Sequence, residues 1–137
     1  MSRKAVIDVS FAACWIFPDE ANDTADEVLG SIESGDLAPL APVLWQHEFG
    51  NLLRSGTLRG RLTESAAFQA LGFAEAIGWR WDAKTAGSDV LALAFRTGLT
   101  FYDATYLELA KREACPLLTM DGKLQSAAAL EGVATRL

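Results

Sequence analysis

The stretch that decides the fold is AVIDV, residues 5–9. Its apolar and β-branched side chains suit a buried strand, and Asp8 places a carboxylate near the carboxyl end of that strand. A helical pattern follows, because TADE at residues 24–27 has the spacing of a capping box and apolar side chains then recur at helical intervals as far as Gly35. The chain therefore begins with a buried strand and a crossover helix.

The remainder of the chain repeats this alternation. The pattern predicts further strands at residues 37–40, 79–81 and 116–119, with a last short strand around Val133. It predicts helices at 42–55, with Pro42 as the first helical residue, and then from Thr63, over 90–97, from near Asp103 and over the 127–130 region. Since parallel strands need helical crossovers, we expect one α/β sandwich domain over residues 1–137 with a mostly parallel sheet.

The composition limits what this protein can be. The chain has 137 residues, half of them hydrophobic, with 12 basic and 18 acidic side chains and a net charge of −6. This length suits one compact domain, and the composition excludes disordered, fibrous and disulfide-rich classes. The acidic balance argues against broad electrostatic capture of nucleic acid and leaves room only for a local cationic strip.

The cysteines and the apolar runs bear on the compartment. Cys14 and Cys115 lie in apolar stretches without a second Cys or His at metal-ligand spacing, so we expect buried free thiols and no zinc site. Asp8 interrupts the apolar run near the N-terminus, and no run of about 18 apolar residues follows. We therefore expect a cytoplasmic protein without membrane association.

Four carboxylates are the candidate functional groups. Asp8 and Asp121 lie at or just after predicted strand ends, Asp103 at a helix N-terminus, and Glu48 in the helix after a strand. Because ligands of open parallel sheets bind beyond the carboxyl ends of the strands, these four side chains could converge. Converging carboxylates repel one another, and a hard cation such as Mg²⁺ or Mn²⁺ would compensate them and support hydrolysis at phosphorus.

Each of these residues also has a purely structural interpretation. Asp8 could cap the segment after the first strand, Asp103 could be an N-cap, and Asp121 with Gly122 could form an ordinary turn. Glu48 could lie on a solvated helix face. The residues taken singly leave both interpretations open.

Four segments together resemble the PIN-domain nucleases, and within that family the small VapC-like toxins of toxin–antitoxin pairs. The segments are AVIDVS at residues 5–10, WQHEFGNLL at 45–53, LTFYDATYLELA at 99–110 and PLLTMDGKL at 116–124. Their order and spacing agree with the family over nearly the whole chain. The resemblance implies a three-layer α/β/α sandwich with a mostly parallel central sheet.

The resemblance also implies a function and the residues that carry it. It implies a Mg²⁺- or Mn²⁺-dependent endoribonuclease that acts as a toxin, a homodimer, and a cognate antitoxin that covers the active site. The acidic pocket would consist of Asp8, Glu48, Asp103 and Asp121, with Asp8 and Asp103 as metal ligands and Ser10 and Thr119 as polar supports.

Three arginines and four tryptophans have two interpretations each. Arg54, Arg59 and Arg61 follow the Glu48 helix and could contact RNA phosphates, or they could be scattered charges in a solvated loop. The tryptophans could stack on bases, but core packing fits their spacing better. They are Trp15, Trp45, Trp79 and Trp81.

Two other functions stay open beside the toxin. A housekeeping RNA-processing nuclease of the same fold would carry the same carboxylates, and a non-catalytic scaffold would bind an apolar partner helix. A phospho-accepting receiver domain would need clustered acids after the first strand, and a haloacid-dehalogenase-like phosphatase would need an Asp where Ser10 stands. The sequence argues against both of these.

Overall fold

A computed structural model describes residues 3–137 and has a parallel sheet at its centre. The sheet has four strands in the order β3-β2-β1-β4. They are β1 (Arg3–Ile7), β2 (Leu37–Pro42), β3 (Arg80–Asp82) and β4 (Leu117–Leu118). Every strand pair is parallel, so all four carboxyl ends meet at one edge of the sheet.

Helices connect the strands. The α-helices are α1 (Val9–Ala12), α2 (Asp23–Glu33), α3 (Leu44–Leu58), α4 (Glu64–Glu75), α5 (Gly87–Thr97), α6 (Phe101–Glu113) and α7 (Gly122–Leu130). Two short 3₁₀ turns, η1 (Ala13–Trp15) and η2 (Pro18–Glu20), lie between α1 and α2. No helix in residues 3–137 is long and apolar enough to span a bilayer.

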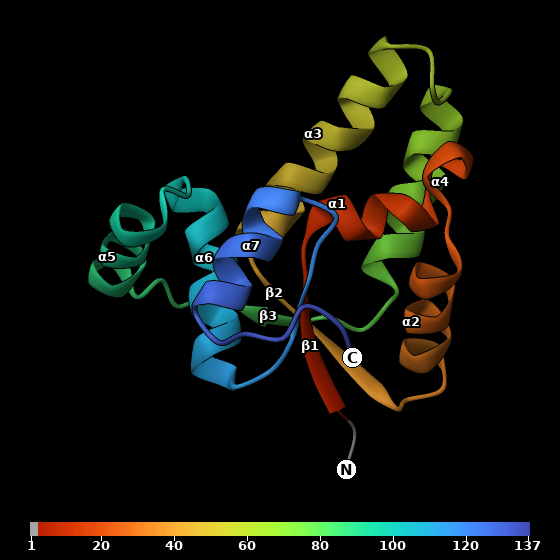
Figure 1. Ribbon diagram of the computed structural model, residues 1–137. Coiled ribbons are helices and arrows are strands. Elements are labelled where there is room, and N and C mark those ends of the chain that lie inside the picture. Colours follow the sequence, from red (N-terminus) through yellow and green to blue (C-terminus); the bar gives the residue numbers. More distant parts are fainter. Residues whose placement is uncertain (1–2) are drawn as a thin grey trace.

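The helices form two layers around the sheet, which confirms the three-layer α/β/α architecture. Figure 1 shows α2 and α4 on one side of the strands and α5, α6 and α7 on the other. α2 packs against β2, whereas α6 packs across β1, β2 and β4 and carries α5 on its outer side. α3 leaves the carboxyl edge of the sheet and extends beyond it beside α4 (Figure 1).

The core follows from the apolar pattern of these elements. Val6, Ile7 and Leu117 in the central strands are fully buried, and so is Leu107 on the inner face of α6. Burying such side chains on both faces of a parallel sheet is what a β-branched, continuously apolar strand predicts. The first strand predicted from AVIDV is confirmed, but it ends at Ile7, because Asp8 caps α1 and Val9 is the first residue of that helix.

Several element boundaries differ from the sequence prediction. Asn22, not Thr24, caps α2, and its side chain accepts a hydrogen bond from the Ala25 N–H at 2.8 Å. Pro42 ends β2 opposite Asp82 of the edge strand β3, and α3 begins two residues later. Thr24 and Pro42 are both residue types that commonly begin a helix. The hydrogen bond of Asn22 determines where α2 begins, and the pairing of Pro42 within the sheet determines where α3 begins.

The C-terminal part of the chain brings a further correction. No strand forms around Val133 within residues 3–137. A single backbone hydrogen bond from the Leu117 N–H to the Ala134 carbonyl, at 2.9 Å, connects this segment to β4. One bond does not make a ladder, so the segment runs along the sheet edge without extending it.

Candidate active site

The four predicted carboxylates line one cleft at the carboxyl edge of the sheet. The cleft has a volume of about 400 Å³ and is lined by the residue that follows β1, by residues of α1, α3 and α6, and by the N-cap of α7. Asp8 follows β1, Asp121 precedes α7, and Glu48 and Asp103 come from α3 and α6. The structure therefore brings together side chains that the sequence places up to 113 positions apart.

Asp8 is the most constrained of the four. It is 7% exposed and caps α1, with Oδ1 accepting hydrogen bonds from the Phe11 N–H at 3.0 Å and the Ser10 hydroxyl at 2.7 Å. The Thr119 hydroxyl donates to Oδ2. Asp8 therefore caps α1, as its structural interpretation predicts, and it also lines the cleft.

Ser10 and Thr119 tie β1 to β4 at this point. Their hydroxyl oxygens lie 3.1 Å apart, and the Ser10 oxygen also accepts a hydrogen bond from the Met120 N–H at 2.9 Å. Thr119 Oγ1 accepts one from the Asp121 N–H at 3.0 Å. These contacts connect Ser10 and Thr119 to Asp8 and to the backbone at Asp121, the two acidic residues that follow the central strands.

Glu48 is held by a tyrosine that sequence reasoning missed. The buried Tyr106 donates its hydroxyl proton to Glu48 Oε1 at 2.5 Å. Tyr106 lies three residues after Asp103 on α6, so the two side chains project from the same face of that helix. The sequence indicated this role only through the spacing of three residues between Asp103 and Tyr106 within the segment 99–110.

Asp103 and Asp121 each sit in the first turn of a helix or at its cap. Asp103 is the third residue of α6, whose N-cap is Thr100, so the N-cap interpretation of Asp103 was wrong. Asp121 is the N-cap of α7 and accepts hydrogen bonds from the Lys123 and Leu124 N–H groups at 2.9 and 3.2 Å. Helix N-termini favour negative charge, which helps to hold these carboxylates in place.

The cleft disfavours the ionised form of three of these groups. Burial raises the pKa of Asp8, against the hydrogen bonds from Thr119, Ser10 and Phe11. Burial and the nearby charges of Asp103 and Asp8 raise the pKa of Glu48, and burial and Asp121 raise that of Asp103. Desolvated like charges are costly to hold together, and a bound cation would remove that cost.

The carboxylates do not form a ready-made cage. Within the part of the chain that the structure describes, no three Asp, Glu, His or Cys side chains are grouped closely enough to hold a metal ion. Mg²⁺ needs fewer protein ligands than such a cage provides, because it commonly retains waters and binds through one or two carboxylates together with substrate phosphates. Asp8 and Asp103, the predicted metal ligands, lie near enough for the charge of Asp103 to raise the pKa of Asp8.

The three predicted phosphate-binding arginines separate in the structure. Arg59 lines the acidic cleft together with Asn51 and Ser55, two polar residues that sequence reasoning did not assign. Arg61 is instead paired with Asp19 at 3.0 Å and Glu20 at 2.7 Å. Its guanidinium also lies 3.9 Å from the centre of the Phe17 ring, so its charge is already compensated.

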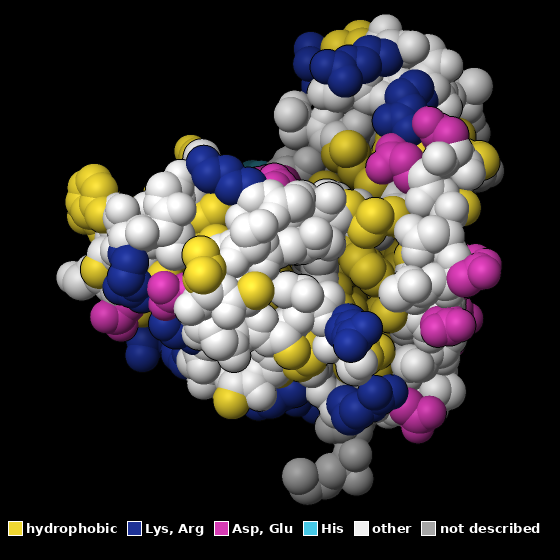
Figure 2. All heavy atoms as spheres, viewed as in Figure 1, with side chains coloured by type: hydrophobic (Ala, Val, Ile, Leu, Met, Phe, Trp, Pro, Cys, Tyr) yellow, Lys and Arg dark blue, Asp and Glu magenta, His cyan; other side chains and the backbone are white. Residues whose placement is uncertain are grey.

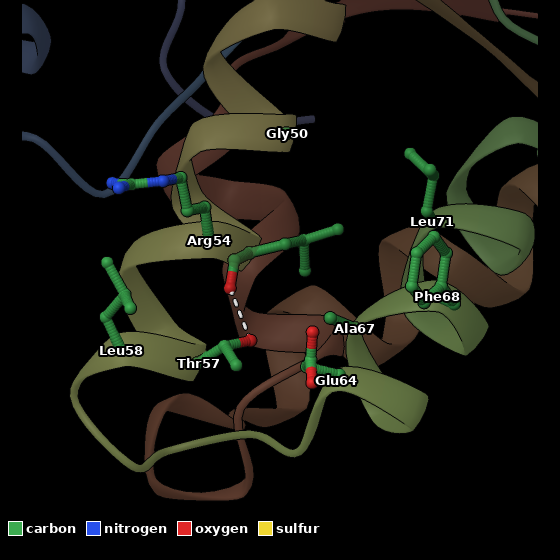
Figure 3. A pocket seen from close by; sticks show the side chains of 9 residues that line it. Gly50, Arg54, Thr57, Leu58, Glu64, Ala67, Phe68 and Leu71 are labelled. Carbon is green, nitrogen blue, oxygen red and sulfur yellow. Dashed lines mark hydrogen bonds between the residues drawn. The ribbon is translucent and has the colours of Figure 1, made fainter.

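Arg54 faces a different hollow, an apolar groove between α3 and α4 of about 530 Å³. Figure 3 shows Phe68 and Leu71 of α4 on one side of this groove, with the Arg54 guanidinium pointing away from them. Leu58 and Phe68 are 69% and 74% exposed. The groove is therefore an exposed apolar surface on the far side of α3 from the carboxylates.

Three of the four tryptophans pack against one another, and Trp15 packs edge-on against Phe11 with ring centres 6.0 Å apart. Trp45 stacks on Phe49 with ring centres 4.6 Å apart and contacts Trp79 and Trp81. Trp45 and Trp79 are buried, whereas Trp81 is 37% exposed at the edge strand. The core interpretation is confirmed for Trp45 and Trp79, and both cysteines are buried free thiols as expected.

No family model matches the chain. The ribonuclease VapC3 of Pyrobaculum aerophilum is 32% identical over 130 residues, which cover 88% of this chain and 92% of VapC3.

Two solved structures share the fold. PAE2754 from P. aerophilum superposes with a TM-score of 0.72 and 27% identity, over 93% of this chain and 87% of PAE2754. VapC20 of Mycobacterium tuberculosis, a toxin that cleaves the sarcin–ricin loop, superposes with a TM-score of 0.62 and 20% identity, over 90% and 94% of the two chains.

Proposed function

The chain belongs to the VapC-like branch of the PIN-domain nucleases, and on this premise we propose that it is a metal-dependent endoribonuclease, the toxin of a toxin–antitoxin pair. The observation that carries the proposal is the convergence of four carboxylates on one cleft, three of them with raised pKa values. A fold that served stability alone would gain nothing from placing these groups together without cations.

We assign the metal to Asp8 and Asp103. Oxygen ligands suit Mg²⁺ and Mn²⁺, and the remaining coordination positions are left for water and for a phosphate of the substrate. Bound there, the cation would neutralise the scissile phosphate and make an attacking water more acidic. Ser10, Thr119 and the Phe11 N–H hold the Asp8 carboxylate in one orientation, which the ligand role requires.

The other two carboxylates have supporting roles in this proposal. Glu48, held by the Tyr106 hydroxyl, would orient the attacking water and take up its proton. A raised pKa brings Glu48 nearer to the pKa of an effective base at neutral pH. Asp121 would add to the negative field that attracts the cation.

The partners follow from the same family membership. We propose an RNA substrate, a homodimer in the cytoplasm, and a cognate antitoxin. The apolar groove between α3 and α4, with the exposed Leu58 and Phe68, offers the anchor sites that an amphipathic antitoxin helix would fill. The groove lies on the opposite side of the helix that carries Glu48, so an antitoxin helix bound there would need a further segment to reach the cleft.

Expression in a bacterial host tests the proposal. Induction of the wild type should arrest growth and produce new RNA ends, whereas Asp103→Asn at equal protein level should do neither. Asp89→Asn is the matched control, because it makes the same chemical change on the exposed face of α5, outside the cleft.

The outcomes separate the alternatives. Arrest by both the wild type and Asp103→Asn would contradict catalysis and support a partner-binding scaffold. RNA cleavage without growth arrest would support a housekeeping nuclease and contradict the toxin role.

A further inference from the structure

The wall of the cleft that α3 provides changes from acidic to basic along its length. Glu48, Asn51, Ser55 and Arg59 all line the cleft and follow one another at intervals of three or four residues, so they lie on one face of the helix. Arg59 lies eleven residues beyond Glu48, roughly 16 Å along the helix axis. The acidic centre is therefore at one end of this row and a guanidinium at the other.

Arg59 is the basic residue of this wall. Among the described residues that line the cleft it alone is basic, and it makes no ion pair with any described carboxylate. Figure 2 shows Lys and Arg side chains gathered over the far end of α3, away from the sheet. The backbone at Arg59 is fixed, because its N–H donates to the Ser55 carbonyl at 3.0 Å and Gly60 ends the helix with φ at +77°.

This arrangement suits a polyanionic strand that crosses the cleft. A guanidinium presents a planar fork of donors that matches phosphate, and Ser and Asn side chains also donate to phosphate oxygens. The distance from Glu48 places Arg59 beyond the carboxylates that would act on the scissile phosphate. A charge at this position would hold a different phosphate of the same strand.

We propose that Arg59 is the residue that positions the RNA, binding a phosphate away from the cleavage point so that the strand runs along α3 over Asn51 and Ser55. The inference rests on the proposed nuclease function. It also explains how a protein of net charge −6 would hold RNA, because a short cationic end of one helix replaces a broad basic surface.

Binding measured without cleavage tests this assignment. The probe is a short fluorescein-labelled single-stranded RNA of mixed sequence, titrated with Asp103→Asn protein over a series of NaCl concentrations. Adding Arg59→Gln should weaken binding about tenfold, the loss expected for one charged phosphate contact. It should also flatten the plot of log K against log salt by about 0.7, the contribution of one phosphate on a single strand.

Two further variants make the test specific. Arg80→Gln removes the same charge from an exposed position on β3, outside the cleft, and should leave both quantities unchanged. Arg59→Lys keeps the charge without the fork, so it should restore the salt slope but only part of the affinity. In the cleavage-competent protein, Arg59→Gln should raise KM and leave kcat unchanged, because Arg59 does not touch the scissile phosphate.

The results distinguish this inference from the proposed function. If the wild type cleaves RNA and Arg59→Gln binds it as Arg80→Gln does, the assignment of Arg59 is wrong and the nuclease function stands. If Arg59→Gln loses binding but the wild type cleaves nothing, the nuclease function is wrong and the phosphate contact stands. A wild type that binds no RNA overturns both.

Discussion

Two groups of carboxylates in this protein differ in their surroundings among the described residues: one group has basic partners and the other does not. On the α6 side of the molecule, Arg112 binds Asp82 at 2.8 Å and Glu108 at 2.9 Å, and Glu131 accepts hydrogen bonds from Arg96 and Lys111. The contacts with Arg96 and Lys111 hold the pKa of Glu131 down at about 2. In the cleft, Asp8, Glu48 and Asp103 have no basic partner within ion-pair distance among the described residues, and their pKa values are raised.

The electrostatic cost of the folded state lies in the cleft, where the carboxylates have no basic partner within the described part of the chain. Glu131 in the paired group contributes to stability, because its lowered pKa means that its ionised form is favoured in the folded chain. The unpaired ones oppose stability at neutral pH, and hydrogen bonds from Thr119, Ser10 and Tyr106 hold Asp8 and Glu48 in place. The proposed cation site would make use of this uncompensated charge.

The largest effect that this contrast predicts is on metal-dependent cleavage. Chelation should abolish RNA cleavage, Mg²⁺ or Mn²⁺ should restore it, and Asp103→Asn should lower it about 1000-fold, since the cation contributes several kcal/mol to the transition state. Calorimetry should detect Mg²⁺ binding to the wild type and to Glu131→Gln, but not to Asp103→Asn. Equal heats for the wild type and Asp103→Asn would contradict the assignment of the metal.

A smaller effect should follow from removing a support of Asp8. Thr119→Val keeps the shape of a buried side chain but removes the hydroxyl that donates to Asp8, so cleavage should fall roughly 10- to 100-fold. Unfolding in urea should show a loss of about 1–2 kcal/mol, because a buried carboxylate oxygen loses its partner. Thr105→Val, whose hydroxyl bonds within α6, is the matched control and should keep full activity; activity equal in both variants would refute the supporting role.

Removing a basic partner from the paired carboxylates should change stability and leave cleavage unchanged. Arg112→Met leaves Glu108, which is 8% exposed, without its cation and should cost about 1–2 kcal/mol of unfolding free energy. Cleavage per folded molecule should not change. Arg80→Met, at an exposed position, is the control and should lower the unfolding free energy by less than half as much. A loss of cleavage in folded Arg112→Met would contradict the distinction between the two groups of carboxylates.

The smallest effect is a pair of opposite pH dependences. The raised pKa of Asp103 means that stability falls as pH rises from the unfolded to the folded pKa, so Asp103→Asn should be more stable than the wild type near neutral pH. That difference should vanish below the ordinary pKa of 3.8. Glu131 has a lowered pKa, so its carboxylate stabilises the fold above 4.5 and that contribution is lost as pH falls through about 2.

Unfolding in urea across a pH series, in metal-free buffer, measures both dependences. Glu131→Gln should be less stable than the wild type near neutral pH and should converge with it in acid. Curves for Asp103→Asn and Glu131→Gln that shift in the same direction would contradict the contrast between the two groups.

Local sequence patterns predicted some parts of this fold well. The helix that ends at Gly98 and the helix capped by Thr63 form as the apolar spacing and the cap residues indicate. Thr24 and Pro42 were misassigned because more than one nearby residue satisfies the same local rule. Hydrogen bonding by Asn22 and the pairing of Pro42 with Asp82 decide between the candidates, and neither contact is visible in a short window of sequence.

The residues of the candidate site likewise divide into those that the sequence could place and those that it could not. Asp8 and Asp121 could be placed from the sequence, because each lies at or just after the end of a predicted strand and parallel strands end at one edge. Tyr106 and Ser55 could not be assigned, because their roles depend on which faces of α3 and α6 turn toward the cleft. The three arginines looked equivalent in sequence, yet Arg61 is occupied by Asp19 and Glu20.

The sequence by itself determined the order of the elements, the chemistry of the carboxylates and their positions at strand and helix ends, because these depend on interactions between near neighbours in the chain. Only the tertiary structure decided which side chains share the cleft and which charges are paired. Asp8 and Thr119 meet across 111 positions, and Glu48 and Tyr106 across 58. Contacts at such separations form only when the packing of whole helices on the sheet fixes the direction of every side chain.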